Sequence, residues 1–488
     1  MSGRRQPINR RTRQVIRAWA SILGALVAAT SLLAACDATA TPTAGPPDAG
    51  SVVEAITEEG LQARLDALEE VSVPADGFRA LGTSGYAAAA DLVATELREA
   101  GWQVTEDVFT TPAFTDGGGS ELVVGGRSFG AADIRPLIFA PGGDVRGPIV
   151  ALDWDENATS PSGKGCAKAD YGVLPDGAIV LARSGPCRRR DQILAAQEAG
   201  AAGFVAGYPW AESGRVLRPT LIEPAGLEIP AVSASRTAGS AMAAAAAAGA
   251  TGRVTSDAAT APAETRSIIA ELVGSEPGAV VMLGAHLDSV IDGPGINDNG
   301  SGVAALLEIA RALGSSTPRA TIRLAFWAAE EVGLQGSFRY VDGLSEAERT
   351  AIVAYLNADM VASPNGFAGV YDEGAAAPGS GAVRDLVWAA VERAGGVPVA
   401  QDAGGGSDHY PFTRAGIATG GVFSGAIEPV TREEAVASGA TAGSPADECY
   451  HQGCDDGSML DLDLGHLLTD ALADVAVQLS NDPGLAAP

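Results

Sequence analysis

The sequence predicts an α/β fold with a mainly parallel, mixed sheet flanked by helices, together with an inserted β-rich α+β module. Two observations lead to this prediction. After residue 263, apolar runs of strand length at 279–286, 321–328, 351–359 and 416–423 alternate with helical patterns at 301–313, 344–351 and 380–395. From about 113 to 262, short strands and turns replace this alternation. Apolar strands that alternate with helices are typical of a parallel sheet covered on both faces.

The expected elements follow in order along the chain. Residues 53–106 contain two stretches with helical spacing of apolar residues, LQARLDALEEV and GYAAAADLVATELREAGWQV, and the second ends at Gly101. The module at 113–262 holds four expected strands, RGPIVALDW, GAIVLARSG, AGFVAGY and IPAVSAS. It also holds two Ala-rich helical patterns, RDQILAAQEAGAAG and TAGSAMAAAAAAG. We therefore expect one domain from 53–112 and 263–482, with 113–262 inserted into it.

The N-terminus has the pattern of an export signal. The first 35 residues carry six arginines and no acidic residue, and an apolar run ends at Cys36. A retained membrane anchor is the alternative, because the run is almost long enough to span a bilayer. The sequence LAAC at 33–36 resembles the bacterial lipobox, in which the cysteine receives a lipid and becomes the mature N-terminus. We therefore expect a signal peptide and lipobox at 1–36, a flexible tether at 37–52, and an extracytoplasmic protein anchored to the cell membrane, with partial release from it left open.

Size and charge exclude several classes of protein. A chain of 488 residues with 46% hydrophobic residues can bury a large core, so it is neither disordered nor a simple repeat. Its net charge is −28, and removal of the arginine-rich signal makes it more negative still. Such a surface repels nucleic acid and anionic lipid. We expect a monomer without a nucleic-acid partner.

The cysteine count indicates disulfides. Apart from Cys36, the chain has four cysteines, and they form two pairs that are local in sequence. An even number in an exported chain is typical of disulfide bonding, and four cysteines allow three pairings. The local pairing is the expected one, Cys166 with Cys187 and Cys449 with Cys454.

Acidic residues and a histidine stand at the ends of successive predicted strands. The first strand ends in GAHLDSV, which contains His286, and the following turn contains Asp298. The second strand leads into AEEVGLQGS with Glu330 and Glu331, and the third ends in LNADMVASPN with Asp359. The carboxyl ends of parallel strands meet at one edge, where ligands bind. Four unpaired carboxylates gathered there would repel one another, so the pattern predicts a divalent cation.

The residue types indicate which metal and how many ions. Mixed imidazole and carboxylate ligands favour Zn²⁺, with Co²⁺ or Mn²⁺ as substitutes. The set exceeds the three protein ligands of one catalytic zinc, so two ions fit better, about 3.5–4 Å apart across a bridging carboxylate. Calcium is a further candidate that these motifs do not identify.

Neighbouring residues suggest roles in catalysis. Asp288 lies two residues after His286 and is expected to accept a hydrogen bond from the far imidazole nitrogen, which would orient the ring. Adjacent side chains on a strand point to opposite sides. One of Glu330 and Glu331 is therefore expected to bind metal, while the other faces the water as general base.

Six ordered motifs resemble the di-zinc aminopeptidases of peptidase family M28, of the secreted streptomycete and vacuolar yeast types. They are AHLDSV, GINDNGSGVAALLEIAR, FWAAEEVGLQGS, LNADMVASPN, SDHYPF and CYHQGCDD. The resemblance covers about 55–112 and 263–480. It implies the zinc-exopeptidase fold, also called phosphorylase/hydrolase-like, and hydrolysis of peptides from a free N-terminus.

The resemblance also implies a role for each site residue. His286 and Asp359 would bind one zinc, Glu331 and His451 the other, and Asp298 would bridge them. Glu330 would be the general base, Asp288 the partner of His286, and Tyr450 a hydroxyl that stabilises the oxyanion. The Cys449–Cys454 bond would then hold the loop that carries Tyr450 and His451.

Three further positions need interpretation. His409 in SDHYPF is a rival ligand, but the family pattern places this segment in the pocket wall. Some relatives have an arginine before the Ser-Asp pair, whereas this chain has Gly406, which puts that contact in doubt. His466 lies in a C-terminal helical pattern and is expected to be structural.

The inserted module also resembles a known domain. GPIVALD, GCAKADY, GAIVLARSGPC, QILAAQEAGAAGFVAGY and IPAVSAS are similar to the protease-associated (PA) domain, whose local disulfide would join Cys166 to Cys187. The resemblance assigns no catalytic groups to it.

Other functions remain open at this point. A glutamate-releasing carboxypeptidase combines the same two domains but would favour a basic pocket, and the active-site motifs show little Arg or Lys. A glutaminyl cyclase would need only one zinc, and a non-catalytic binding lipoprotein would be expected to lack ligands. Large apolar N-terminal residues such as leucine are the expected substrates.

Overall fold

The computed structural model describes residues 45–487 except 73–76, 160–161, 210–214, 277, 315, 373–376 and 403. The predicted signal peptide, Cys36 and the first half of the predicted tether, up to residue 44, lie outside the described residues. Within the described part of the chain, no helix is both long enough and apolar enough to span a bilayer.

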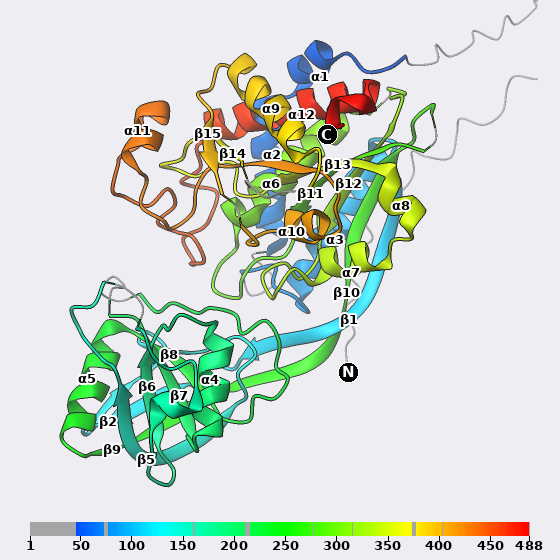
Figure 1. The fold of residues 1–488 in the computed structure, drawn as a ribbon. Coiled ribbons are helices and arrows are strands. Elements are labelled where there is room, and N and C mark those ends of the chain that lie inside the picture. Colours follow the sequence, from blue (N-terminus) through cyan, green and yellow to red (C-terminus); the bar gives the residue numbers. More distant parts are fainter. Residues whose placement is uncertain are drawn as a thin grey trace, which may run out of the picture. The chain divides into compact units, whose positions relative to one another are not determined.

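The described chain begins with three helices, and strands and helices follow along the rest of it (Figure 1). The helices are α1 (Ala49–Ala55), α2 (Glu58–Ser72), α3 (Ser84–Glu99), α4 (Arg189–Glu198), α5 (Arg236–Ala247), α6 (Gly302–Leu313), α7 (Gln335–Gly343), α8 (Glu346–Ala351), α9 (Ser380–Arg393), α10 (His409–Arg414), α11 (Arg432–Ser438) and α12 (Leu462–Asn481). The strands are β1 (Gln103–Asp116), β2 (Glu121–Val124), β3 (Arg127–Phe129), β4 (Ile134–Pro136), β5 (Gly143–Leu152), β6 (Ile179–Arg183), β7 (Gly203–Gly207), β8 (Ala231–Ala234), β9 (Thr251–Ser256), β10 (Ala258–Leu272), β11 (Val280–His286), β12 (Thr321–Trp327), β13 (Ile352–Ala358), β14 (Gly369–Tyr371), β15 (Val399–Gln401) and β16 (Thr419–Phe423).

The first sheet has eight strands in the order β1-β10-β12-β11-β13-β16-β14-β15. Its centre is parallel, because β11 pairs in parallel with both β12 and β13, and β13 does so with β16. Antiparallel pairs lie nearer the edges, where β10 joins β1 and β12, and β14 joins β16. The prediction of a mixed sheet with a parallel centre is confirmed.

Alternate residues of the central strands enter two different cores. Val281, Leu283 and Leu356 pack with the apolar faces of α2, α3, α6, α9 and α12. Met282 and Tyr355, one position away on the same strands, pack on the other face with α7 and α10. Successive side chains of a strand point to opposite faces, so this sheet is covered by helices on both sides.

The second sheet also has eight strands, in the order β3-β2-β9-β5-β6-β7-β8-β4. Strands β5 to β8 are parallel neighbours, and β2, β3, β4 and β9 pair antiparallel. Val180 and Phe204 face the core that includes α4, whereas Leu181 and Val205 face the core that includes α5. The helices α4 and α5 therefore cover opposite faces of this sheet (Figure 1).

Two features differ from the expectation. Helix α1 begins inside the segment expected to be a tether at 37–52, because Asp48 caps it by accepting from the Ser51 amide and Val52 is buried. The long strands β1 and β10, which pair over their whole length between Gln103↔Glu271 and Asp116↔Ala258, were not predicted. Much of β1 and of the N-terminal part of β10 is exposed, so neither carries the continuous apolar pattern that marked the central strands.

Candidate active site

Side chains with metal-binding atoms collect at one edge of the first sheet. Strand β11 ends at His286, β13 ends directly before Asp359, and Glu330 and Glu331 follow β12 after two alanines. Asp298 lies in the turn Ile296–Ser301 directly before α6, where its own backbone is not helical. Because β11, β12 and β13 are parallel, their carboxyl ends share this edge, as the sequence predicts.

His286 stands at the centre of one group of candidate ligands. Its Nε2 atom lies 3.3 Å from Asp298 Oδ1 and 3.4 Å from Asp359 Oδ1. The His286 side chain is only 2% exposed. These three atoms are close enough to one another to share a metal ion.

His451 stands at the centre of a second group. Its Nε2 atom lies 3.1 Å from Asp298 Oδ2 and 3.2 Å from Glu331 Oε2. The two carboxylate oxygens of Asp298 therefore face different histidines. The structure thus brings together the two ligand sets that the resemblance implies, with Asp298 between them.

Glu330 and Glu331 do not point to opposite sides of the sheet, contrary to the prediction. Strand β12 ends at Trp327, and Ala329 has a left-handed backbone with φ 62°. The alternation of an extended strand therefore no longer applies at these residues. Both carboxylates line the same pocket and each offers an oxygen near His286.

Asp288 contacts its neighbours differently from the prediction. His286 Nδ1 lies 2.9 Å from the backbone carbonyl of Asp288, whereas the carboxylate oxygen Oδ1 is 4.0 Å away. The carboxylate instead accepts hydrogen bonds from the amides of Glu330 and Glu331, at 3.0 and 3.3 Å. The left-handed Ala329 turns these two amides toward it. Asp288 therefore orients His286 through its main chain and the two glutamates through its side chain.

Burial and crowding dominate the electrostatics of the site. Burial raises the pKa of Glu330 well above its usual value, with Glu331 and other carboxylates adding to the shift, and burial raises the pKa of Asp288 to about 7. Burial acts the same way on Asp298, but hydrogen bonds from His286 and His451 outweigh it and lower the pKa of this carboxyl. A carboxyl that accepts from both imidazoles stays ionised.

The loop that carries Tyr450 and His451 is closed by the Cys449–Cys454 disulfide. His451 has a left-handed backbone with φ 58°, and its ring stacks on the Tyr450 ring with centroids 3.8 Å apart. Burial raises the pKa of Tyr450 well above its usual value, and the site carboxylates add to this shift. The phenol is therefore neutral and able to donate a hydrogen bond.

The turn that carries Asp298 is held by two residues that sequence reasoning missed. Asp455 accepts from the amides of Asn297 and Asp298, at 2.7 and 3.1 Å. Arg79, which is fully buried, donates to the carbonyls of Leu287, Pro294 and Gly295. A lone arginine and an acid directly after a cysteine carry no periodic signal, so neither could be found from the sequence.

Asp359 has a partner in the SDHYPF segment. Ser407 Oγ donates to Asp359 Oδ2 over 2.6 Å and accepts from Asn357 Nδ2 at 2.8 Å. His409 is buried beside this network, where its Nε2 lies 3.1 Å from the Gly404 carbonyl, and it belongs to none of the ligand groups found in the described residues. The segment therefore supports a ligand without supplying one.

The remaining candidates lie as expected or away from the site. His466 lies on α12, where its Nε2 atom is 3.2 Å from the Ile56 carbonyl. It contacts none of the candidate metal ligands in the described residues. Gly406 lines the pocket but brings no charge to it.

Two pockets meet at the candidate ligands. The acid pocket contains His286, Glu330, Asp359 and the aromatic residues Phe367, Tyr371 and Phe423, and its described lining includes no Lys or Arg. The arginine pocket contains Arg135, Arg189, Arg215, Arg218 and Asp292. Glu331, Tyr450 and His451 line both pockets, so the second ligand group lies at their boundary. The arginines come from the inserted module, which is why the active-site motifs did not reveal them.

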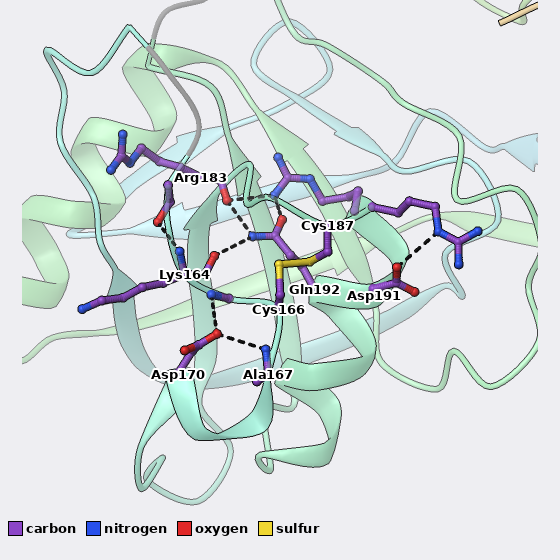
Figure 2. Close-up of a disulfide and its surroundings, with 12 residues drawn as sticks. Lys164, Cys166, Ala167, Asp170, Arg183, Cys187, Asp191 and Gln192 are labelled. Atoms are coloured by element: carbon purple, nitrogen blue, oxygen red, sulfur yellow. Dashed lines mark hydrogen bonds and ion pairs between the residues drawn. A yellow bond between two sulfur atoms is a disulfide. The ribbon is translucent and has the colours of Figure 1, made fainter. Parts of the chain in front are cut away.

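Cys187, which lines the arginine pocket, forms a disulfide with Cys166. Figure 2 shows this bond and its neighbours. Beside it, Gln192 donates to the carbonyls of Lys164 and Arg183, at 3.4 and 3.0 Å. The disulfide joins the loop at Cys166 to the segment before α4, and Gln192 of α4 links that loop to the end of β6.

The donor set fits divalent zinc. Each candidate group combines one imidazole nitrogen with two carboxylate oxygens, and these atoms lie within 4.8 Å of one another. Zinc favours such mixed nitrogen and oxygen ligands. Glu331 Oε1 is buried without a hydrogen-bond partner among the described residues. A buried carboxylate oxygen without a partner is costly, and a cation would satisfy it.

Comparisons with known proteins identify the family. Residues 267–476 match peptidase family M28, and residues 145–242 match the PA domain. An aminopeptidase of Pseudomonas aeruginosa strain UCBPP-PA14 is 35% identical over 86% of this chain and 80% of that protein. The chain belongs to peptidase family M28. This M28 peptidase is also 37% identical to the probable lipoprotein aminopeptidase LpqL of Mycobacterium tuberculosis, over 82% of this chain and 80% of that protein.

A solved structure shares its fold. The zinc aminopeptidase BSAP from Bacillus subtilis superposes with a TM-score of 0.69 at 22% identity, over 88% of this chain and 96% of that one. The peptidase with an inserted PA domain that the motifs indicated is thereby confirmed as to family and fold.

Proposed function

We propose that this protein is a metallo-aminopeptidase that removes N-terminal residues from peptides with two zinc ions. The acid pocket carries the proposal: it joins both ligand groups to Glu330 and Asp359 and has no Lys or Arg in its described lining. Such a pocket favours the positive charge of a free amino terminus. The names of the similar proteins from Pseudomonas aeruginosa and Mycobacterium tuberculosis support the same activity.

The residues suggest how the peptide bond is hydrolysed. His286 and Asp359 would hold one zinc, Glu331 and His451 the other, and Asp298 both. When bound, the pair of zinc ions supplies Lewis acidity and a water of lowered pKa. Glu330, whose pKa burial raises, accepts a proton from the attacking water and passes it to the leaving amine. The neutral Tyr450 hydroxyl donates to the oxygen on which negative charge develops.

The acid pocket also supports a substrate preference. Phe367, Tyr371 and Phe423 provide apolar surface beside Asp359 and Glu330. Large apolar N-terminal residues such as leucine would bury surface against these rings. The proposal therefore covers the side chain of the N-terminal residue as well as its free amino group.

The decisive experiment measures bound zinc and hydrolysis of leucine p-nitroanilide. We expect about two zinc ions per chain and activity that a chelator removes and zinc restores. Glu330→Ala is the matched control, because it should keep the zinc and lose activity by a factor of about 10² or more. A protein that binds zinc but leaves the anilide intact contradicts the proposal.

A glutamate-releasing carboxypeptidase is a second candidate, favoured by the arginine pocket beside the ligands. Guanidinium groups bind a terminal carboxylate well. N-acetylated peptides separate the two activities, because an aminopeptidase needs a free amine and a carboxypeptidase does not. Release of the last residue from N-acetyl-leucyl-glutamate would favour the second candidate.

Export and lipid attachment at Cys36 are also proposed, supported by the LAAC motif and the arginine-rich segment before it. The name of the similar Mycobacterium tuberculosis protein, probable lipoprotein aminopeptidase LpqL, agrees with this proposal. Incorporation of labelled fatty acid into the wild type but not into Cys36→Ser would test it.

A further inference from the structure

The arginine pocket gathers positive charge in an otherwise acidic protein. The chain has 60 acidic residues against 32 Lys and Arg. Yet the described lining of this pocket contains four arginines and only two carboxylates, Asp292 and Glu331. One of these, Glu331, already belongs to a candidate ligand group. Within this described lining, guanidinium groups therefore outnumber carboxylates.

Arg218 is the most buried of these arginines at the boundary of the two sheets. Its side chain is 4% exposed, and it pairs with Asp116 Oδ2 at 2.5 Å and with Asp292 Oδ2 at 3.5 Å. Arg135 pairs with the same Asp292, so two guanidinium groups share that carboxylate. Nη1 of Arg218 is buried without a hydrogen-bond partner among the described residues. A buried donor without a partner is costly, and an anion in the pocket would satisfy it.

Arg189 brings a charge to the pocket and donates hydrogen bonds to three neutral groups. It donates to the Arg183 carbonyl, to Gln192 Oε1 and to Ser184 Oγ, at 3.2, 2.6 and 2.8 Å. Gln192 is held beside the Cys166–Cys187 disulfide (Figure 2). The guanidinium is thus fixed in the wall of the pocket without a counter-charge from these contacts.

Arg215 joins this wall to the loop of the second ligand group. Its Nη2 atom donates to the Tyr450 carbonyl over 3.1 Å. The arginine pocket therefore begins where the proposed oxyanion donor and zinc ligand stand.

The two pockets give a bound peptide a direction. Glu330 and Asp359 line the acid pocket but not the arginine pocket. An amino terminus bound beside them would therefore place the first residue of the peptide in the acid pocket. Glu331, Tyr450 and His451 lie at the boundary, where the scissile bond would be. The leaving part of the peptide then extends into the arginine pocket.

We propose that the arginine pocket binds a carboxylate of the leaving peptide, so that the preferred substrates are short peptides whose free C-terminal carboxylate reaches Arg135, Arg215 and Arg218. This inference rests on the proposed function, because it takes the acid pocket as the site of the amino terminus. Arginine pairs with carboxylates through two parallel hydrogen bonds, which gives both affinity and geometry. The inserted PA domain thereby acts as a specificity element for the peptidase.

The test compares binding of Leu-Gly-Gly and of Leu-Gly-Gly-amide to the zinc-loaded Glu330→Gln variant by calorimetry. This variant is chosen because it should bind peptide without cleaving it. We expect the free acid to bind about tenfold more tightly than the amide, and higher salt to reduce the ratio. Leu-Glu-Gly-amide forms a second arm: binding as tight as that of Leu-Gly-Gly would assign the carboxylate to an acidic side chain.

Arginine variants in the Glu330→Gln background locate the effect. Arg218→Gln should bring the ratio of acid to amide close to one, and Arg135→Gln and Arg215→Gln provide the same test at more exposed positions in case the buried change prevents folding. Arg253→Gln is the matched control. Arg253 is an exposed residue of β9 that pairs with Asp144 of β5, and it does not line the arginine pocket. The ratio should be unchanged in this control.

Equal binding of acid and amide, or a ratio that survives all three pocket variants, overturns the inference. Failure of the proposed function has a different signature, because leucine p-nitroanilide carries no carboxylate. If the wild type did not hydrolyse leucine p-nitroanilide but the acid still bound more tightly than the amide, the aminopeptidase activity would be contradicted. The carboxylate site would then still be supported.

Discussion

At the residue scale, two histidines with similar sequence contexts have different surroundings. His451 Nε2 lies within 3.2 Å of carboxylate oxygens from Asp298 and Glu331. His409 is buried next to Tyr371, with ring centroids 4.9 Å apart, and its Nε2 lies near a backbone carbonyl. Carboxylate neighbours mark the histidine that is expected to bind metal, and contacts with a backbone carbonyl and an aromatic ring mark the one that is expected to pack.

This difference predicts unequal effects on metal content. His451→Ala should lose about one of the two zinc ions per chain and lower activity by a factor of about 10² or more, since it removes a candidate ligand and leaves Asp298 and Glu331 without their imidazole partner. His409→Ala should keep both ions. Zinc per chain, measured by atomic emission after dialysis, checks both. Equal zinc in the two variants would argue against His451 as a ligand.

Asp408 predicts a pH dependence of stability. The carboxyl is buried, and burial raises its pKa to about 7, although His286 and the Ser337 hydroxyl act in the opposite direction. In the folded protein it therefore holds its proton at pH values where an unfolded chain would release it. The free energy of unfolding contributed by this group is present below about pH 4 and is lost as the pH rises toward about pH 7.

Asp408→Asn should remove this loss in the metal-free protein. Relative to the wild type, the variant should gain about 1–3 kcal/mol in unfolding free energy between about pH 5 and pH 8. Urea unfolding with a chelator at both pH values measures the difference. The exposed Glu433→Gln change on α11 serves as control. If the unfolding free energies of Asp408→Asn and Glu433→Gln changed with pH in the same way, the Asp408 carboxyl would not titrate in this range.

At the element scale, the two disulfides serve different structures. Cys166–Cys187 joins two loops of the inserted module, whereas Cys449–Cys454 closes a short loop around Tyr450 and His451. His451 adopts a left-handed backbone inside that loop, a conformation that a free chain rarely adopts. Cys449–Cys454 therefore fixes the loop of a candidate ligand, whereas Cys166–Cys187 fixes part of the wall of the arginine pocket.

Removing each bridge should separate these roles. The double variant Cys449→Ser/Cys454→Ser should lower zinc affinity by about 10- to 100-fold, because the His451 loop must be ordered on binding. Cys166→Ser/Cys187→Ser should lower thermal stability while zinc affinity stays close to that of the wild type. Competition for zinc with a chromogenic chelator measures both, and equal zinc affinities would remove the assigned role of the loop.

How far the sequence predicts these elements depends on their burial. The strands β11, β12 and β13 carry continuous apolar runs because both faces are covered, so their position and the ligands at their ends could be predicted. The strand β1 shows no such run, because much of it is exposed. Asp288 was misread because a turn after β12, rather than the strand itself, directs the amides of Glu330 and Glu331.

At the scale of the whole molecule, the candidate site combines parts that lie far apart in the chain. Arg79, Asp298 and Asp455 come from three different regions, and each contributes to one turn at the edge of the first sheet. A single charged residue has no periodicity, so its partner across the fold cannot be read from the sequence. His451 could be placed only through the resemblance to family M28, because no strand pattern leads to it.

The crowding of carboxylates predicts that metal stabilises the fold. In the absence of zinc, Asp298, Glu330, Glu331 and Asp359 lie close together and repel one another. Zinc at about 100 times its dissociation constant should add about 2.7 kcal/mol per site to the free energy of unfolding and raise Tm by several degrees. Differential scanning calorimetry with and without zinc measures the shift, which Asp298→Ala should largely abolish. A Tm insensitive to zinc would contradict a resident metal.

The pairing of β1 with β10 bears on how such a protein could arise. The last pair of this ladder, Asp116↔Ala258, brings the start and the end of a long intervening segment to neighbouring positions. A two-residue turn at that point would join the same strands as an ordinary hairpin, with the order of the first sheet unchanged. Ancestors could therefore have acquired or discarded the intervening segment in a single genetic event. The apolar contacts of Ala329 and Val332 with that segment would then favour keeping it once gained.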